Sequence, residues 1–374
     1  MAGLYIHIPF CKKACAYCNF HFDTNFKTKT DVVKAIGHEL VLRKEEIPGA
    51  LNSIYFGGGT PSVLTKQELE YLFNIIHKAY DVSECKEITF EVNPDDATPE
   101  NLDFWHSLGI NRLSMGVQSF FNADLAYMGR FHKAEESIQA IKNLNLSKFD
   151  NYTIDLIYGS PTLTDEMWKA NLDFASQNNI PHISSYALTV EPNTKLSYRI
   201  QKTKQKSPLD EDAARQFKIL QDWAIEHGYE HYEISNLGQP NKKAIHNSNY
   251  WNGTPYLGIG PSAHSFNGNT RKWNIANNKK YIECLSEGKV AFEVEVLNNI
   301  DSMNEMLMIH LRTKAGLSLM HFKDLFGMDA LDKLKIEITR IPKEYIIYTD
   351  QSLLIKPEYW MLSDGIISDL FFIE

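Results

Sequence analysis

Three cysteines near the start of the chain are the residues best suited to chemistry. Three residues separate Cys11 from Cys15, and two separate Cys15 from Cys18. Thiolates are soft metal ligands, but a structural zinc ion or a fully ligated iron–sulfur cluster prefers four protein ligands. A [4Fe-4S] cluster held here would therefore keep one iron open for a substrate or cofactor. Two alternatives are a zinc site completed by His7 or His21 and three buried free thiols.

A glycine-rich turn and polar side chains follow the next hydrophobic runs. Residues 57–61, Gly-Gly-Gly-Thr-Pro, permit close backbone approach and offer free amide hydrogens to a carboxylate or amine, although a plain strand-to-helix turn has the same composition. Glu91 suits ribose hydroxyls or an ammonium group, and its alternative is a satisfied carboxylate at a strand end. Tyr17, between two of the cysteines, is a candidate to pack on an adenine ring.

These groups need a scaffold, and the hydrophobic pattern predicts an α/β fold. Short β-branched or aromatic runs alternate with longer stretches of helical period from residue 4 to about residue 190. The predicted strands are 4–8, 53–56, 87–92, 112–117, 152–157 and 183–190, and predicted helices include 31–46, 66–80, 99–108 and 134–144. This alternation predicts right-handed crossovers, a parallel sheet and a site at the polar ends of its strands.

The chain is expected to contain three regions. Residues 1–235 form the predicted barrel core, 236–300 an irregular extension, and 301–374 a small winged-helix-like α+β domain. The extension is rich in Gly, Asn and aromatic residues, and long loops in compact proteins tend to be functional. The last region is predicted to contain two or three helices, a hairpin over 345–355 and a final helix near 366–371.

Composition and charge exclude several classes of protein. The chain has 374 residues, 43% of them hydrophobic, and a formal charge of −9. This hydrophobic content excludes disorder, and no apolar stretch approaches the ~18 residues of a membrane span. The N-terminus does not read as a signal peptide, so we expect a cytoplasmic protein. The chain shows no basic stripe, so we expect no nucleic-acid partner. The clustered cysteines do not suit a disulfide framework, and Cys85 and Cys284 are expected to be buried without a role.

The motifs together resemble a known family. The cysteine spacing is similar to that of radical S-adenosylmethionine (SAM) enzymes. With residues 5–11, 57–61, 116–119 and 155–159, the chain resembles, over nearly its whole length, the oxygen-independent coproporphyrinogen III oxidase family, which includes HemN and its relative HemW. The resemblance implies a partial (β/α)6 radical SAM barrel, with a [4Fe-4S] cluster on the cysteines and SAM on the open iron. It implies SAM contacts at Tyr5, Tyr17, Gly58, Gly59, Thr60, Glu91, Gln118, Arg130, Asp155 and Ala187. Whether the protein binds a second SAM molecule is not decided by the resemblance.

Three features distinguish the branches of this family. The oxidases carry a further cysteine where this chain has Phe20, and they have an N-terminal extension, whereas this chain begins almost at its first strand. His246-Asn-x-x-Tyr250-Trp251 resembles the HNxxYW motif of HemW. The resemblance therefore implies a haem chaperone, with His246, Tyr250 and Trp251 at the haem and His264 as a second candidate ligand. The alternative for His246 is a loop histidine bonded to backbone, and the alternative function is coproporphyrinogen III oxidation.

Further partners follow from the same resemblance. A haem chaperone of this kind implies a haem or porphyrin ligand and respiratory haem proteins as recipients. Peripheral membrane association through those recipients and a cluster-dependent homodimer are further expectations.

Overall fold

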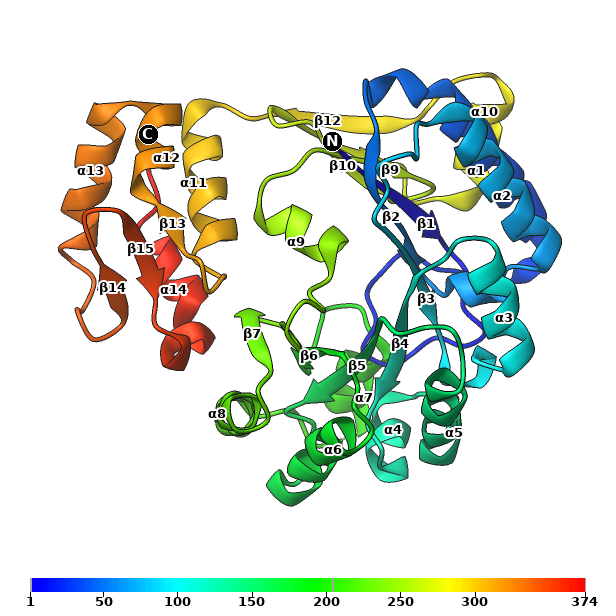
Figure 1. Ribbon diagram of the computed structural model, residues 1–374, viewed down its shortest axis with the longest axis horizontal. Coiled ribbons are helices and arrows are strands. Elements are labelled where there is room, and N and C mark those ends of the chain that lie inside the picture. Colours follow the sequence, from blue (N-terminus) through cyan, green and yellow to red (C-terminus); the bar gives the residue numbers. More distant parts are fainter. Residues whose placement is uncertain (1, 204, 374) are drawn as a thin grey trace.

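A parallel sheet forms the centre of the molecule. The structure is a computed structural model and describes residues 2–203 and 205–373 (Figure 1). Its first six strands are β1 (Ala2–Ile8), β2 (Leu51–Gly58), β3 (Glu87–Val92), β4 (Arg112–Gln118), β5 (Tyr152–Tyr158) and β6 (His182–Ala187). They lie side by side in chain order, and every neighbouring pair is parallel. The predicted α/β fold is confirmed, although β6 ends three residues before the predicted residue 190.

Helices cover the outer face of these strands. They are α1 (Lys29–Leu42), α2 (Lys66–Ala79), α3 (Pro99–Ser107), α4 (Asn122–Met128), α5 (Ala134–Asn145), α6 (Asp165–Gln177), α7 (Lys195–Thr203) and α8 (Asp210–Glu226). Three of them begin at a threonine, Thr65, Thr98 or Thr164, whose side chain accepts a hydrogen bond from an amide of the first turn. Loops of different lengths therefore connect the carboxyl ends of the strands to the helices, and the longest of these, between β1 and α1, carries the three clustered cysteines.

The region after residue 229 is ordered and mostly extends the sheet. It contains β7 (Glu230–Glu233), β8 (Asn236–Gly238), α9 (Ile245–Trp251), β9 (Tyr256–Ile259), β10 (His264–Phe266), β11 (Thr270–Asn274), α10 (Asn278–Ser286) and β12 (Phe292–Val296). The strand order is β12-β11-β10-β9-β1-β2-β3-β4-β5-β6-β8-β7, with β9 parallel to β1. The prediction of an irregular extension over 236–300 is therefore wrong, and a boundary at residue 235 separates the paired strands β7 and β8.

A buried ion pair fastens this extension to the first helix. Glu39 of α1 and Arg43, the residue directly after this helix, lie 2.8 Å apart and are 0% and 3% exposed. Arg43 also donates to the carbonyl of Gly258, at 2.9 Å, and Glu39 accepts from the amide of Gly260, at 2.8 Å, and from the hydroxyl of Tyr281. Because each buried charge has several partners, the desolvation cost of the pair is offset.

The C-terminal region packs against the open side of the barrel. It comprises α11 (Asn299–His310), β13 (Leu317–Ser318), α12 (Leu319–Phe326), α13 (Met328–Ile338), β14 (Ile346–Tyr348), β15 (Ser352–Ile355) and α14 (Ser363–Ser368). The three strands form a small antiparallel sheet, which confirms the predicted hairpin, but the final helix ends at Ser368 rather than near residue 371. Backbone hydrogen bonds from Ile234 to Arg312, at 3.0 Å, and from Lys314 to Tyr232, also at 3.0 Å, join this region to β7 and its neighbours.

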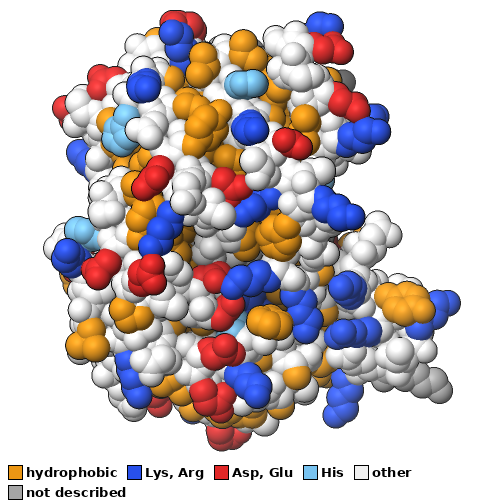
Figure 2. All heavy atoms as spheres, turned by 90° about the vertical axis from the view of Figure 1, so that its right-hand side faces the viewer, with side chains coloured by type: hydrophobic (Ala, Val, Ile, Leu, Met, Phe, Trp, Pro, Cys, Tyr) orange, Lys and Arg blue, Asp and Glu red, His pale blue; other side chains and the backbone are white. Residues whose placement is uncertain are grey.

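The surface and the remaining cysteines complete the description. Figure 2 shows the side on which α1, α2 and α3 lie, where hydrophobic side chains are interspersed with charged ones. Within residues 2–203 and 205–373, no helix is both long enough and apolar enough to cross a membrane. Cys85 and Cys284 are half-buried, so the prediction that both are buried is wrong.

Candidate functional site

A pocket lies at the carboxyl ends of the parallel strands. Side chains of a strand alternate between its two faces, so β3 sends Ile88 and Phe90 into the core under the helices and Glu91 toward the barrel interior. The pocket has a volume of about 400 Å³. Eleven of the predicted site residues line it: Cys11, Cys15, Cys18, Tyr17, Gly58, Gly59, Thr60, Glu91, Gln118, Arg130 and Asp155.

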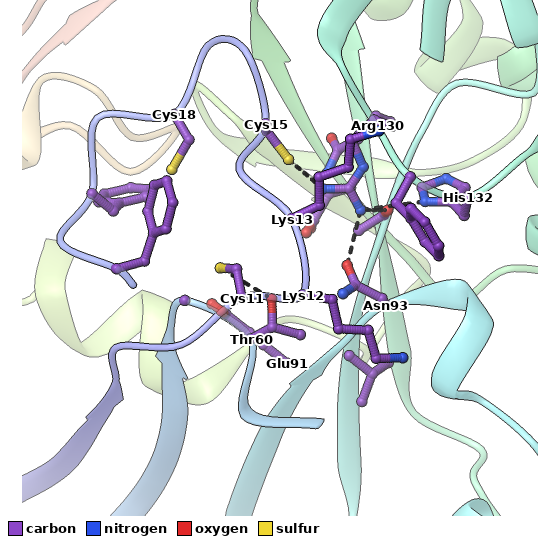
Figure 3. A pocket seen from close by; sticks show the side chains of 18 of the residues that line it. Cys11, Lys12, Lys13, Cys15, Cys18, Thr60, Glu91, Asn93, Arg130 and His132 are labelled. Carbon is purple, nitrogen blue, oxygen red and sulfur yellow. Dashed lines mark hydrogen bonds between the residues drawn. The ribbon is translucent and has the colours of Figure 1, made fainter. Parts of the chain in front are cut away.

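The cysteines lie on a loop that follows β1. Figure 3 shows Cys11, Cys15 and Cys18 arranged around one space, and all three are half-buried. The backbone anchors the loop at both ends, since the amide of Cys11 donates to the carbonyl of Asp23, at 3.0 Å, and that of Ala16 to the carbonyl of Met128, at 2.8 Å. A short loop held in this way keeps three thiols at one mouth of the barrel.

The three thiols form a donor set that an iron–sulfur cluster can use. Among the residues that the structure describes, no three His, Cys, Asp or Glu side chains lie close enough to share one metal ion. In a cluster, each thiolate binds a different iron, so the sulfurs need not converge. Burial raises the pKa of Cys11 to about 11, and a metal would have to displace that proton, because metals bind the thiolate. A guanidinium nitrogen of Arg130 lies 3.2 Å from the Cys15 sulfur and would compensate part of the negative charge.

The glycine turn packs directly against the cysteine loop. Gly58 has φ of +104°, and a Cβ built there would lie 2.5 Å from the ring of His7. A Cβ at Gly59 would lie 2.7 Å from the backbone of Ile8 and Phe10. Both positions therefore require glycine.

The prediction of free amides at this turn is corrected by the structure. The amide of Gly59 donates to the carbonyl of Ile8, at 2.9 Å, and that of Thr60 to the carbonyl of Phe10, at 2.8 Å. These two groups fasten the turn to the loop and are not available to a ligand. The turn instead lets the backbone of β2 pack closely against the cysteine loop. It also places the Thr60 hydroxyl 3.5 Å from the Cys11 sulfur.

Charged groups from two strands and one loop face the cysteines across the pocket: Glu91 of β3, Asp155 of β5 and Arg130, which follows α4. Arg130 donates to the carbonyl of Gly116, at 2.7 Å, and to the side-chain oxygen of Asn93, at 3.0 Å (Figure 3). Burial raises the pKa of Asp155 to about 6 and that of Glu91 to about 7. The inner part of the pocket thus combines the Arg130 guanidinium with two carboxyl groups whose charge is costly without a partner, and Lys12, Lys13 and Asp95 also line the pocket. This combination suits a ligand bearing both an ammonium and a carboxylate group.

Two of the predicted SAM contacts lie outside the pocket lining. The Tyr5 hydroxyl lies 3.1 Å from Nδ1 of His7, and its ring stacks on Tyr55 in the barrel interior. Ala187 is the last residue of β6, and its neighbour Tyr186 lines the pocket instead.

The residues of the HNxxYW motif also lie away from the pocket. They form α9, and His246 is 2% exposed, with Nδ1 at 2.9 Å from the Ser53 hydroxyl and Nε2 at 3.1 Å from the Tyr250 hydroxyl. Both ring nitrogens are therefore occupied by side chains. The alternative of a loop histidine bonded to backbone is therefore wrong, because His246 lies in a helix and its ring bonds to side chains. The role of His246 as a haem ligand stays a prediction.

Sequence reasoning did not identify several residues of the pocket and the barrel interior. Ser114, His132 and Tyr186 line the pocket, and Tyr55 donates to Glu91 from behind it. Tyr55 and Ser114 could have been predicted from the sequence. Each lies two positions before a motif glycine, Gly57 or Gly116, and residues two apart lie on the same face of a strand.

Comparison with known proteins agrees with this geometry. Residues 5–175 match the model of the radical SAM superfamily. A Lactococcus lactis protein named heme chaperone HemW is 32% identical, over 93% of this chain and 91% of that protein. A Bacillus subtilis protein of the same name is 31% identical, over 87% of each chain. The solved structure of coproporphyrinogen III oxidase HemN from Escherichia coli has the same fold, with a TM-score of 0.85 at 20% identity over 99% of this chain and 90% of the other. By its sequence over nearly its whole length, the chain belongs to the HemW family of radical SAM proteins.

Proposed function

We propose that this protein is a cytoplasmic haem chaperone that binds a [4Fe-4S] cluster, SAM and haem and delivers haem to respiratory haem proteins. The observation that carries the proposal is its likeness to proteins named heme chaperone HemW across about nine-tenths of the chain. Peripheral association with membranes through the recipient proteins and a cluster-dependent homodimer belong to the same proposal.

The pocket supplies the groups that the two cofactors require. Cys11, Cys15 and Cys18 would hold the cluster, and Gly58, Gly59, Thr60, Glu91, Gln118, Arg130 and Asp155 surround the place for SAM. A reduced cluster with SAM on its open iron supplies the electron that can cleave a carbon–sulfur bond. The residues of the chain would bind and orient SAM. Glu91 and Asp155 line the pocket and would receive an ammonium group or hydroxyls, and the Tyr17 ring would pack on the adenine.

His264 is the better placed of the two candidate haem ligands. It is exposed at the start of β10, and its ring stacks on Trp273 with 6.1 Å between ring centroids. Partial burial and the charge of Arg271 lower its pKa, so the imidazole is neutral at physiological pH, which is the form that binds iron. Histidine is a common axial ligand of haem, and an indole offers a flat apolar face for the porphyrin. We therefore assign the haem to His264 rather than to the buried His246.

Coproporphyrinogen III oxidation is the second candidate function. The pocket keeps Gln118, Arg130 and Asp155, which in the family resemblance belong to the oxidases as well. Phe20 favours the chaperone, because it stands at the pocket rim, 68% exposed, where the oxidases carry a cysteine.

Anaerobic reconstitution with iron and sulfide separates the two functions. The reconstituted protein is titrated with haem while its Soret absorbance is recorded, and a parallel sample receives coproporphyrinogen III, SAM and a reductant. We expect stoichiometric haem binding and no protoporphyrinogen IX. Conversion of coproporphyrinogen at an enzyme-like rate would contradict the proposal.

A further inference from the structure

Helix α9 closes the barrel at the end opposite the cysteines. The carboxylate of Glu87, at the start of β3, accepts hydrogen bonds from the amides of Ile245, at 2.7 Å, and His246, at 2.9 Å. The His246 ring lies between the first residues of the neighbouring strands, since it bonds to Ser53 of β2, and a Cβ at Gly3 of β1 would lie 3.2 Å from it. His246 therefore points into the barrel interior from the amino ends of the strands, opposite the cysteines.

One side chain separates His246 from the pocket. The Tyr55 ring lies on the imidazole, with 5.0 Å between ring centroids, and its hydroxyl donates to Oε1 of Glu91 at 2.8 Å. The space around this contact is full, because a Cβ at Gly57 would lie 2.8 Å from the Tyr55 ring and 2.9 Å from Oε1 of Glu91. A column of contacting side chains thus runs from α9 through His246 and Tyr55 to a carboxylate that lines the pocket.

The column has a fixed base. The Tyr250 hydroxyl bonds to Nε2 of His246, and the Asn249 amide donates to the Ser53 hydroxyl at 3.2 Å. On its other side, α9 packs against α11 of the C-terminal region, between that region and the barrel (Figure 1). A side chain held at both ring nitrogens cannot rotate, and it can therefore fix the position of the ring above it.

We propose that His246 is a positioning residue for the SAM pocket, acting through Tyr55 to aim the carboxylate of Glu91 at SAM. The inference rests on the proposed SAM site and adds to it a support at the far end of the barrel. It gives the HNxxYW motif a role that needs neither exposure nor contact with haem. The expected signature is that His246 and Tyr55 act on SAM binding as one unit.

Equilibrium dialysis of labelled SAM against the reconstituted protein tests the inference. The variants are Tyr55→Phe, which removes only the hydroxyl, His246→Asn, which removes the ring but keeps a polar group for Ser53, and the double variant. Tyr55→Phe loses one hydrogen bond to the Glu91 carboxylate, which predicts about tenfold weaker SAM binding. His246→Asn should show a loss of the same size, because it removes the ring that positions Tyr55. The double variant should bind no more weakly than the weaker single variant, because residues that act through one another are not additive. Iron content and thermal unfolding verify that each variant folds and holds its cluster.

Two further measurements separate the possible failures. His231→Ala removes an imidazole that packs on Trp360, remote from Glu91, and should leave SAM affinity unchanged. Haem affinity should be unchanged in His246→Asn. Unaltered SAM binding in Tyr55→Phe, or losses that multiply in the double variant, would overturn the positioning role while leaving the SAM site intact. Haem loss in His246→Asn with normal SAM binding would restore the ligand role, and a wild-type protein that binds no SAM would overturn the site and the inference together.

Discussion

Individual side chains in the pocket show how the barrel compensates buried charge. Arg130 reaches the Cys15 sulfur, the Asn93 side chain and the Gly116 carbonyl, so one cation joins the cysteine loop to two strands. Glu91 accepts a hydrogen bond from the Tyr55 hydroxyl and Asp155 from the Ser114 hydroxyl. Within residues 2–203 and 205–373, neither carboxylate forms an ion pair with a lysine or arginine. The pocket is therefore prepared for a positively charged group.

Replacing Glu91 by glutamine should change how stability depends on pH. Burial, with a contribution from Asp155, raises the pKa of Glu91 from 4.5 to about 7. The folded protein therefore binds a proton more tightly than the unfolded chain, and this contribution to stability is lost as pH rises through that interval. Glutamine stays neutral, so the melting temperature of cluster-free Glu91→Gln should rise relative to wild type between about pH 5 and about pH 8. Glu45→Gln, at an exposed position, is the control. A difference in melting temperature between Glu91→Gln and wild type that stays constant from about pH 5 to about pH 8 would contradict the raised pKa of Glu91.

Replacing His264 by alanine should weaken haem binding. A lost axial ligand removes the iron–nitrogen bond, whereas stacking on Trp273 is retained, so we expect at least about tenfold lower affinity, a loss of about 1.4 kcal/mol. Absorbance titration measures the affinity, and the shift of the Soret band reports the ligand. His321→Ala, at an exposed histidine of α12, is the matched control. Equal affinities of the two variants would remove His264 from the haem site.

At the scale of elements, the sequence predicts the parallel half of the fold well. The bounds of β3 agree with the prediction, because its β-branched run is bordered by polar residues on both sides. The extension was missed because β9 to β12 have three to five residues each, and β9 pairs with β1, from which it is separated by most of the barrel. Local pattern carries no information on such distant pairing.

The candidate site was predictable to a similar degree. Residues on strand ends and in the cysteine loop were found, since the ends of parallel strands must meet at one edge. The burial of His246 could not be predicted, because a polar side chain on a helix gives no sign of whether it faces solvent or polar groups of a barrel interior. Its hydrogen-bond partners Glu87 and Ser53 lie about 160 and 190 residues earlier in the chain.

Alanine at Gly58 should destabilise the glycine turn more than alanine at a comparable open position. Gly58 and Gly288 both have positive φ, but a Cβ at Gly288 meets nothing within 4 Å. The backbone term costs about 1–2 kcal/mol at both positions, and the clash with His7 should add about 1–3 kcal/mol at Gly58. Denaturant unfolding of the cluster-free variants measures the difference. Equal losses would mean that His7 moves aside freely.

At the scale of the molecule, the barrel and the C-terminal region share one hydrophobic core. Leu4 and Phe56 of the barrel belong to the same buried cluster as Leu307, Leu311 and Trp360. Trp360 is 1% exposed, and its ring meets His231 with 4.9 Å between ring centroids. The two regions are therefore expected to unfold together.

Trp360→Ala should lower the stability of both regions. Removing a buried tryptophan costs about 3–5 kcal/mol, and the loss should appear in one transition seen alike by far-ultraviolet circular dichroism and by fluorescence. Leu362→Ala, at a position 52% exposed, is the control and should change little. Two separate transitions in Trp360→Ala would show that the C-terminal region unfolds independently.

The most direct test of the chaperone assignment is the transfer of haem. The reconstituted protein is loaded with haem, separated from free haem and mixed with the haem-free form of a respiratory haem protein, whose gain of its own absorbance spectrum is followed with time. The account predicts that haem leaves this protein and that the recipient becomes loaded in proportion, while His264→Ala, which retains little haem, transfers little. Haem that remains bound to this protein while the recipient stays empty would contradict the account.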